Sequence, residues 1–521
     1  MKGVYVKMSI DKTEFTIYNI EKTIYQIACE SAQKMLKSVL ETLDNQLMSE
    51  RDRTKYRHKG LKKTTLKTIM GEVEYERAIY SCKDEDGKSY HVYLLDELLG
   101  FNSVGFVSEN LAEKLVELAC DLSYRKSSKT ACEITGQTIS HQGIWNVVQR
   151  LGERVDEREQ EQAQLAKNNQ SIGHEEVELL FEEQDGVHLN LQGKDRKKHG
   201  KKHEMKIAIA YKGAVKTGKK RYNLVGKVAC ANFENSNKFY ARKEGVIGAV
   251  YNRDEIQMRI LNGDGATWIK RSVTDENVYF QLDTYHRNKA ITEYVKDPEA
   301  RKVISELLYS KQIDLLLEVI EVYANSTDGH EDGEKEKEGF LKLLTYFKNN
   351  KDGLVSYHRR GLDLPSPPDG IVYRRCGAME SNVFSIIGQR MKRNRTNWSV
   401  KGGNNLARFL TLKSTGKLCE VLGTISTTIL PPKYEEKVQV ALSSSKIPKS
   451  IGKGYNGVKQ SSISNAPSWV RNVLNFNSIQ LSSNLLGGRA TDTVALLWRI
   501  QLSGFDDNIS TAERIGRRST A

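Results

Sequence analysis

Residues 176–283 contain the feature that most limits the fold of this chain, a series of short apolar segments with two helical stretches between them. Apolar runs bounded by turn residues predict strands. We expect strands at 176–191, 204–213, 222–233, 256–264 and 277–283. Helical patterns follow the third strand, at 235–250, and the fourth, from Gly265 onward. Three successive strands, a helix, a strand, a helix and a strand predict one mixed α/β sheet.

The charge balance indicates the kind of partner. The chain has 521 residues with 80 Lys and Arg against 66 Asp and Glu, which gives a formal net charge of +14. A basic excess favours an anionic partner, and nucleic acid is the first expectation. A chain of this length predicts several units, which can be interleaved.

Other sequence signals exclude several classes of protein. The chain contains no apolar run of membrane-spanning length, and its N-terminus has no apolar core of signal-peptide length. Its 7 cysteines are scattered and form no CxxC pair, which excludes zinc-finger spacing and predicts reduced thiols. We therefore expect a cytoplasmic protein that is associated with the nucleoid when it is bound to DNA.

Residues 1–125 predict a mostly helical N-terminal region. A helix is expected at 20–50, and a hairpin is expected to turn at Asp86-Gly87. The segment 51–67 between them is strongly basic, so it is either a nucleic-acid strip or a solvated segment.

Residues 126–170 predict a helix, a turn at Gly136 and a second helix. Ser140 is a candidate cap of the second helix, whose buried side would include Ile144, Val147 and Val148. This arrangement fits a DNA-binding helix-turn-helix as well as an ordinary helical hairpin. The charged run 153–170 predicts a solvated helix or a linker.

The sheet residues belong to a predicted first core segment at 174–286, and the pattern changes again after it. Long amphipathic helices at 287–369 end in a proline-rich linker. A second core segment at 370–425 has a helix that begins near Gly377. Residues 426–521 predict a basic, Ser- and Gly-rich tail with one helix near 493–502.

Two aspartates stand in unusual positions in the predicted sheet. Asp264 ends the fourth strand between two glycines, which permit a tight turn and a close approach of the backbone to a ligand. Its alternative interpretation is a solvated turn. Asp185 lies inside the first strand, where a charge is costly without a partner, and Glu183 shares its strand face.

Glu380 lies near the start of the helix that follows Gly377. On a helical wheel it falls within an apolar stripe of Val383, Phe384, Ile387 and Met391, which should pack on the sheet. The helix dipole alone would explain an acidic residue in the first turn but not its position on the core side.

The three acids Asp185, Asp264 and Glu380 therefore predict one cation site. Carboxylate oxygens suit Mg²⁺ or Mn²⁺. Two such ions about 3.5–4 Å apart activate a nucleophile and stabilise a leaving oxygen in phosphodiester cleavage.

The segments "EEQDGVHL", "NGDGATWI", "LDTYH" and "GAMESNVFSIIGQRMKRN…NWS" together resemble a known family. Over residues 50–425 the chain is similar to DDE-type insertion-sequence transposases of the ISLre-type branch, which is related to the Mutator-like group. This resemblance implies an α/β fold with an RNase H-like mixed-sheet catalytic core and an all-α insertion at 287–369. A mostly helical DNA-binding region would precede that core.

The resemblance also implies a role for each acid. Asp185 would be the first metal-binding aspartate, Asp264 the second, and Glu380 the terminal glutamate. Asp283 and His286 match the D-x-x-H signature of Mutator-like relatives and would support the catalytic site. The alternative for His286 is a local capping or hydrogen-bonding role.

The basic segments would then contact DNA phosphates, at element ends and in target DNA. The candidates between the first two strands are Lys194, Arg196, Lys197, Lys198, Lys201 and Lys202; those after the glutamate helix are Lys392, Arg393 and Arg395. Trp398 would either stack on a distorted base or pack in the core. A homo-oligomer, at least a dimer on DNA, is expected.

Three functions are consistent with these residues. The first is a transposase that cleaves element ends with water and joins the freed 3′-hydroxyl to target DNA by transesterification. The second is an RNase H-like nuclease that only hydrolyses DNA. The third is a catalytically inert DNA-binding relative, against which the presence of all three acids argues.

Overall fold

The computed structural model describes residues 16–101, 106–136, 138–272, 276–326, 333–393, 396–426 and 430–444. Two predictions lie outside the described residues, namely the helix near 493–502 and the DNA contact of Arg395.

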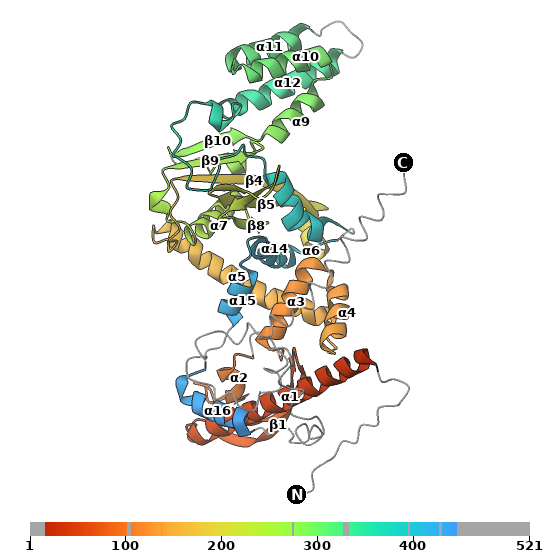
Figure 1. The fold of residues 1–521 in the computed structure, drawn as a ribbon, viewed down its shortest axis with the longest axis vertical. Helices are drawn as coiled ribbons and strands as arrows, with labels where there is room; N and C mark the ends of the chain where they lie inside the picture. Colours follow the sequence, from red (N-terminus) through yellow and green to blue (C-terminus); the bar gives the residue numbers. More distant parts are fainter. Residues whose placement is uncertain are drawn as a thin grey trace, which may run out of the picture. The chain divides into compact units, whose positions relative to one another are not determined.

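A five-stranded mixed sheet forms the centre of the described chain, as the sequence predicts. Its strands are Leu179–Asn190 (β4), Lys202–Tyr211 (β5), Val228–Asn232 (β8), Met258–Gly263 (β9) and Val278–Leu282 (β10). They lie in the order β10-β9-β4-β5-β8 (Figure 1). β5 is antiparallel to both of its neighbours, β4 and β8, whereas β9 and β10 run parallel to β4. The first strand of the series is therefore the central strand.

The prediction of one strand at 222–233 is wrong. The chain instead forms a small hairpin from Gly213–Lys216 (β6) and Tyr222–Val225 (β7), and β8 begins only afterwards. Gly226 has a φ of +67°, a left-handed conformation that glycine tolerates, and its carbonyl accepts a hydrogen bond from the Tyr251 hydroxyl. The chain turns here because this backbone geometry cannot continue a strand.

The alternation of side chains along β4 separates two layers of helices. Leu179 and Phe181 face the larger core, which includes residues of His141–Lys167 (α5) and Val400–Ser414 (α14). Leu180 faces the opposite side, toward Ser236–Gly248 (α7). After β9, Thr267–Lys270 (α8) is only one helical turn, shorter than the sequence predicts.

A buried ionic network links β4, β9 and α7. Glu182 accepts hydrogen bonds from Lys243 Nζ at 2.6 Å and Arg259 Nε at 2.5 Å, and the Arg259 guanidinium also forks onto Glu244. All four side chains are buried. A second network joins α5, α7 and α14, because Glu159 contacts both Arg242 and Arg408. Every charge in these networks has an opposite partner, which offsets its desolvation.

The predicted helical insertion is present. It consists of Thr284–Tyr294 (α9), Pro298–Tyr309 (α10), Ile313–Ser326 (α11) and Gly333–Asn349 (α12). Figure 1 shows α10, α11 and α12 side by side, with α9 leading into them. Their apolar faces share a core with residues of β9 and β10. The insertion thus packs on the parallel edge of the sheet.

The N-terminal region contains more β structure than expected. It comprises Ile17–Glu50 (α1), Arg57–Thr68 (β1), Gly71–Lys83 (β2), Ser89–Val92 (β3) and Leu94–Leu98 (α2). The β2–β3 hairpin is as predicted, but much of the basic strip forms β1, which pairs along β2. Many charged side chains of β1 are exposed, so hydrophobic periodicity does not reveal this strand.

The start of the predicted tail is also ordered. Residues Glu435–Ser444 form α16, which packs against α1, and Tyr434 and Ala441 are buried in the core of the N-terminal region. The predicted tail at 426–521 therefore begins with a packed helix that the sequence does not indicate.

The predicted helix–turn–helix has the expected local geometry. Glu109–Asp121 (α3) is followed by Tyr124–Thr135 (α4), which ends at Gly136 with φ of +66°, and then by α5. Ser140 Oγ accepts a hydrogen bond from the Gly143 amide, and Ile144, Val147 and Val148 are buried.

Helix α5 continues through the predicted linker to Lys167 and contacts α7 and α14. Val155 and Glu159 in this part are buried, so the run 153–170 is not a solvated segment. The second helix of the pair thus also packs in the core of the central sheet.

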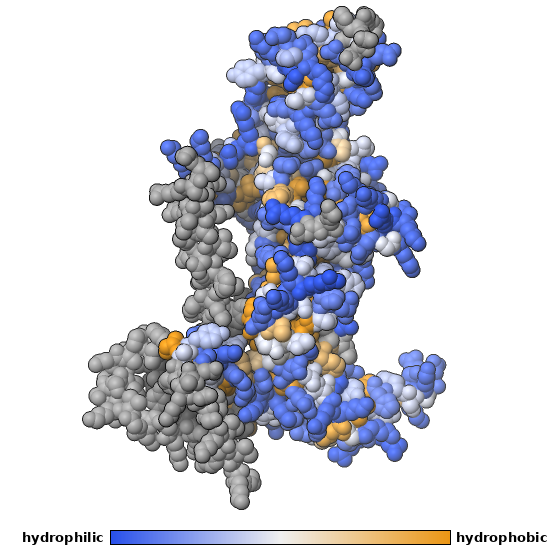
Figure 2. Space-filling view, turned by 90° about the vertical axis from the view of Figure 1, so that its right-hand side faces the viewer, coloured by the Kyte–Doolittle hydropathy of each residue, from blue (hydrophilic) through white to orange (hydrophobic). Residues whose placement is uncertain are grey.

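The face in Figure 2 is mostly hydrophilic, with small separate apolar patches. Among the helices of the described residues, none is long and apolar enough to span a bilayer.

The buried network predicts a large difference between two Glu→Gln variants. Glu182→Gln leaves Lys243 and Arg259 with one uncompensated buried charge and should destabilise the protein by about 3 kcal/mol or more. Glu321→Gln breaks an exposed ion pair with Lys348, whose side chains are 54% and 50% exposed, and should cost less than about 1 kcal/mol. Urea denaturation measures both, and equal effects would contradict the structural role of Glu182.

Candidate metal centre

The first candidate ligand, Asp185, lies on β4 beside the end of the neighbouring strand β9. Its Oδ1 accepts a hydrogen bond from the Gly186 amide at 2.7 Å, and its Oδ2 lies 3.8 Å from His286 Nε2. The side chain is only 13% exposed. Asp185 is therefore held in a fixed orientation toward the N-terminal turn of α9.

Glu380 lies in the short helix Met379–Asn382 (α13) and is exposed. The prediction that it faces the core is wrong, because Val383–Lys392 continues as a π-helix with more residues per turn. Ile387 and Met391 are buried as expected, but Phe384 is 47% exposed. The change of period turns Glu380 toward the rim of the sheet, where its side chain is exposed to solvent.

Asp185, His286 and Glu380 nevertheless converge. One ligand atom from each of these three side chains lies within 4.8 Å of the others. They line a cavity of about 10 Å³ together with Gln184, Asn262, Asp283 and Met379. This is close to the room that one water molecule needs, so the cavity suits one small ion.

Asp264 lies next to this group but is not one of its members. Its Oδ1 accepts a hydrogen bond from the Ala266 amide at 2.8 Å, which is the geometry of a turn closed by a side chain. Gly265 has φ of +86°, and a Cβ there would lie 2.3 Å from Asn350 Oδ1. The flanking glycine is thus required by the backbone and by the packing of the insertion.

The carboxyl group of Asp264 interacts electrostatically with Asp185. Burial raises the pKa of its carboxyl group, and the negative charge of Asp185 raises it further. A carboxyl group whose ionisation is opposed by a neighbouring acid marks a place where a bound cation is stabilising.

Asp283 and His286 have separate roles in this geometry. Asp283 is buried and caps α9, since its Oδ1 accepts hydrogen bonds from the amides of Tyr285 and His286. Its Oδ2 accepts a hydrogen bond from Asn262 at 2.8 Å. Asp283 therefore positions His286 and does not itself face solvent.

The surroundings of His286 favour its protonated form. The interaction with Asp185 raises the pKa of its imidazole, and the charges of Asp283 and Asp264 act in the same direction. The local capping alternative does not describe this side chain, whose ring lies against Asp185.

Glu183 is the residue that organises the centre, and the sequence assigned it no role beyond its shared face with Asp185. It is fully buried, yet its carboxylate accepts hydrogen bonds from the Tyr211 hydroxyl at 2.6 Å and from Asn262 Nδ2 at 3.1 Å. It also accepts hydrogen bonds from the backbone amides of Gly377, Ala378 and Met379, at 2.9, 3.1 and 3.2 Å. It thus fixes the start of the helix that carries Glu380.

The predicted phosphate contacts occupy two exposed stretches. Gly193–His199 (α6) and the turn after it present the six basic residues predicted between the first two strands, which are Lys194, Arg196, Lys197, Lys198, Lys201 and Lys202. Lys392 and Arg393 are also exposed. A bridge between Leu191 and Trp398 brings the chain after the glutamate helix alongside the chain that enters α6.

Trp398 itself is not available to a base. It is only 7% exposed, and its indole Nε1 donates a hydrogen bond to the Met391 carbonyl at 2.9 Å. The stacking hypothesis is therefore wrong for this structure and the core-packing alternative holds, because the Leu191 bridge draws the tryptophan into the sheet edge.

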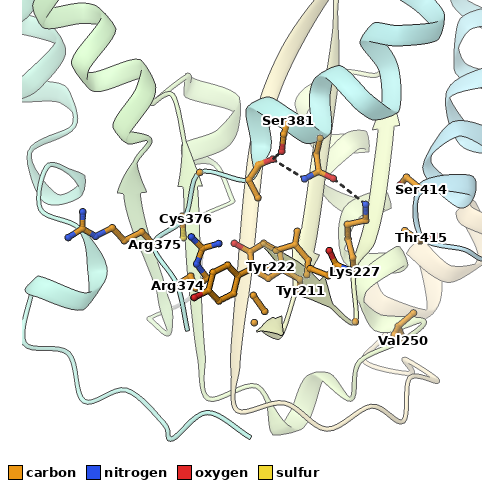
Figure 3. A pocket seen from close by; sticks show the side chains of 18 of the residues that line it. Tyr211, Tyr222, Lys227, Val250, Arg374, Arg375, Cys376, Ser381, Ser414 and Thr415 are labelled. Atoms are coloured by element: carbon orange, nitrogen blue, oxygen red, sulfur yellow. Dashed lines mark hydrogen bonds between the residues drawn. The ribbon is translucent and has the colours of Figure 1, made fainter. Parts of the chain in front are cut away.

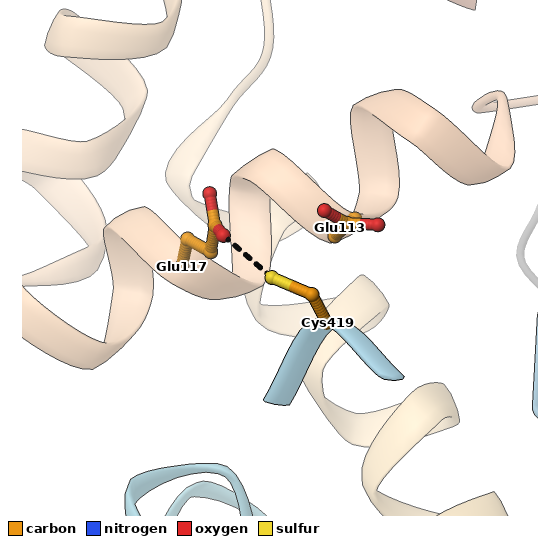
Figure 4. A group of neighbouring side chains, drawn as sticks. All are labelled: Glu113, Glu117 and Cys419. Carbon is orange, nitrogen blue, oxygen red and sulfur yellow. Dashed lines mark hydrogen bonds between the residues drawn. The ribbon is translucent and has the colours of Figure 1, made fainter. Parts of the chain in front are cut away.

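A second group of potential ligands lies elsewhere. Glu113 and Glu117 of α3 approach Cys419 of Leu418–Ser426 (α15), as Figure 4 shows. Lys114 already forms ion pairs with both glutamates, and burial together with Glu117 raises the pKa of the Cys419 thiol to about 12. The charge of this group is thus partly compensated within the protein.

Comparison with known proteins identifies relatives of most of the chain. A family model with the description "Uncharacterised protein family (UPF0236)" matches residues 10–422. UPF0236 protein TTE2489 of Caldanaerobacter subterraneus subsp. tengcongensis is 26% identical over 404 residues, 76% of this chain and 79% of the relative. UPF0236 protein in vanSb 3′ region of Streptococcus gallolyticus is 25% identical over 415 residues, 78% of this chain and 84% of the relative.

A third relative, also from Caldanaerobacter, is 26% identical over 420 residues, 79% of this chain and 80% of the relative. Its name joins eleven locus designations, from TTE0033 to TTE2212.

The clustered acids predict that Asp264→Asn stabilises the protein when divalent cations are chelated. Asparagine can still accept the Ala266 amide but carries no charge toward Asp185. Because the folded-state pKa of Asp264 is raised, ionised Asp264 costs stability above that pKa, and the cost disappears once both states are protonated below about pH 4. The melting temperature of the variant should exceed that of the wild type at pH 8 but not at pH 4.

The control is Asp254→Asn, which changes an exposed aspartate outside this site. An equal rise in both variants, or no rise in Asp264→Asn, would contradict the repulsion between Asp264 and Asp185.

Glu183 predicts a second stability effect that reaches the centre. Glu183→Gln places an amide N–H₂ group against backbone donors and should cost about 2 kcal/mol or more, whereas Tyr211→Phe removes one donor and should cost less. Only Glu183→Gln should also weaken Mn²⁺ binding in a calorimetric titration, since it frees the helix of Glu380. The control is exposed Glu176→Gln, and unchanged Mn²⁺ binding by folded Glu183→Gln would refute the positioning role.

Proposed function

The chain belongs to the UPF0236 family, and we propose that it is a DNA transposase that binds insertion-sequence ends and catalyses metal-dependent DNA cleavage and strand transfer. The observation that carries this proposal is the convergence of Asp185, His286 and Glu380 at the edge of the mixed sheet, with Asp264 beside them.

The topology of the sheet supports the proposal. Three antiparallel strands lead into two strands that run parallel to the first, in the order β10-β9-β4-β5-β8. This order is the one expected for an RNase H-like core. Acids on the first strand, at the end of the fourth and on the following helix are then expected to meet at one edge.

The donor set fits a divalent cation. Asp185, Asp264 and Glu380 offer carboxylate oxygens, which suit Mg²⁺ and Mn²⁺, and His286 adds an imidazole nitrogen, which Mg²⁺ rarely takes. Asp185, His286 and Glu380 line the observed cavity and would hold one ion there, and Asp264, which lies beside them, would help to hold a second. When bound, the ions would polarise the scissile phosphate and favour ionisation of the attacking hydroxyl.

The protein's own side chains would do the rest of the work. Glu183 fixes the glutamate helix, and Asp283 orients His286. The His286 imidazolium can hold a proton next to Asp185 or release it when a cation enters. The exposed cations of α6, with Lys392 and Arg393, would hold DNA phosphates outside the centre.

The names of the relatives give independent support. One sequence from a single bacterium carries eleven locus designations, and another carries four. Several copies of one coding sequence in one genome are expected of an element that moves by transposition. They are not expected of an ordinary nuclease.

Two alternatives remain distinct from this proposal. An RNase H-like nuclease would use the same acids but would not join DNA ends. An inert DNA-binding relative would keep the basic surface without needing the arranged carboxylates.

The test uses a labelled duplex from the DNA that flanks the gene, with Mg²⁺ or Mn²⁺. Wild-type protein should cleave at the element end and join a pre-cut end to target DNA. Asp264→Asn and Glu380→Gln should fold, bind DNA and lose both reactions, and His286→Ala should lose about 10–100-fold.

Glu113→Gln, which alters the other acidic group, is the control and should keep both reactions. Cleavage without joining by the wild type would establish the nuclease alternative. Retained cleavage by folded Asp264→Asn would falsify its assignment as a ligand.

A further inference from the structure

A second cavity, of about 930 Å³, is lined by partners of the Glu183 carboxylate, as is the cavity of the centre. Its wall includes Tyr211 and the segment from Arg374 to Ala378, the same residues whose hydroxyl and amides bind Glu183. Ser381 and Asn382, immediately after Glu380, line it as well. Figure 3 shows Tyr211, Arg374, Arg375, Cys376 and Ser381 around the cavity. The glutamate helix is therefore a wall shared by the two sites.

The cavity is cationic. Lys227, Arg374, Arg375 and Lys417 line it, against a single acid, Glu175. Glu175 is already paired with Lys212. The lining thus carries an excess of positive charge that an anionic ligand would compensate.

Lys227 is the most informative of these cations. Burial lowers the pKa of its ammonium group, and no carboxylate of the described residues pairs with it. Its Nζ donates a hydrogen bond to Asn382 Oδ1 at 3.2 Å, as Figure 3 shows. A half-buried ammonium with only a neutral partner is costly by itself and favourable toward a phosphate.

The opposite part of the cavity offers a flat surface. The Arg374 guanidinium lies 3.9 Å from the ring centroid of Tyr222, and both residues line the cavity. Stacked guanidinium and aromatic planes are surfaces on which nucleobases stack irrespective of sequence. The volume falls within the about 300–1,000 Å³ of sites for small organic ligands, which is far more than one phosphate ion needs.

We propose that this cavity binds one nucleotide of a single DNA strand, with its phosphate on Lys227 and its base beside Arg374 and Tyr222. The assignment of the nucleotide to a DNA strand rests on the proposed function. The preference for a phosphate and a base rests on the residues of the cavity alone. The phosphate would compete with Asn382 for the ammonium group of Lys227. Binding of a nucleotide would therefore alter a hydrogen bond of Asn382, two residues after Glu380.

The experiment measures binding of a short labelled oligothymidylate to the full chain by fluorescence anisotropy, with divalent cations chelated. Lys227→Met should weaken binding about tenfold or more, the loss of one charge-assisted contact. The slope of log affinity against log salt should fall by about 0.7. Lys227→Arg should restore most of the affinity, and Lys220→Met, an exposed lysine outside the cavity, should leave it unchanged.

Stability provides a second readout. Because Lys227 is costly when unpaired, Lys227→Met should keep or raise the melting temperature. Equal binding by Lys227→Met and the wild type would overturn the proposal, as would weakened binding accompanied by a lowered melting temperature. Complete competition by thymidine monophosphate at the concentration of the strand would assign the cavity to free nucleotides and overturn the strand assignment.

The same assay separates this inference from the proposed function. Asp264→Asn should bind the oligothymidylate at least as tightly as the wild type does, because Asp264 does not line the cavity and its loss removes a negative charge near it. If the protein binds the strand through Lys227 but does not cleave end DNA, this inference stands and the proposed transposase function is refuted. If the wild type cleaves end DNA but Lys227→Met binds the oligothymidylate normally, only this inference is refuted.

Discussion

The buried carboxylate of Glu183 is the contact on which the rest of the site depends. A fully buried charge is costly, but two side-chain donors and three consecutive backbone amides satisfy this one. Asp185 lies two residues after Glu183 on β4, and Glu380 directly follows Met379, whose amide donates to Glu183. One interaction therefore sets the separation of two acids that lie far apart in the sequence, and the helical insertion can be accommodated between them.

The sequence predicts those parts of the fold that depend on local pattern. Apolar runs place the strands of the central sheet, although they merge β8 with β7 of the small hairpin, and an apolar stripe indicates the glutamate helix. It fails where tertiary contacts decide. The π-helical period that exposes Glu380 depends on the packing of Ile387 and Met391, and the turn at Gly226 depends on Tyr251. Glu183 looks like any acid until the amides of residues 377–379 reach it.

Charges in this protein divide into those that are neutralised and those that are not. Glu182, Lys243, Arg259 and Glu244 are buried as a balanced set, which ties α7 to the sheet without leaving a net field. The acids around His286 and the cations around Lys227 remain unbalanced. Such unbalanced groups destabilise the protein by itself, and they mark where charged ligands would lower its free energy.

The unbalanced acids and the unbalanced cations both lie near the start of the glutamate helix. A cation bound beside Glu380 would neutralise the acids, and an anion bound at Lys227 would neutralise the cavity cations. Each ligand neutralises the field that the other would meet, so the two should bind more tightly together than alone, and linkage makes this effect reciprocal. Because Asn382 connects Lys227 to α13, the coupling has a direct structural path as well as an electrostatic one. A strand in the cavity would then favour cation binding at the centre.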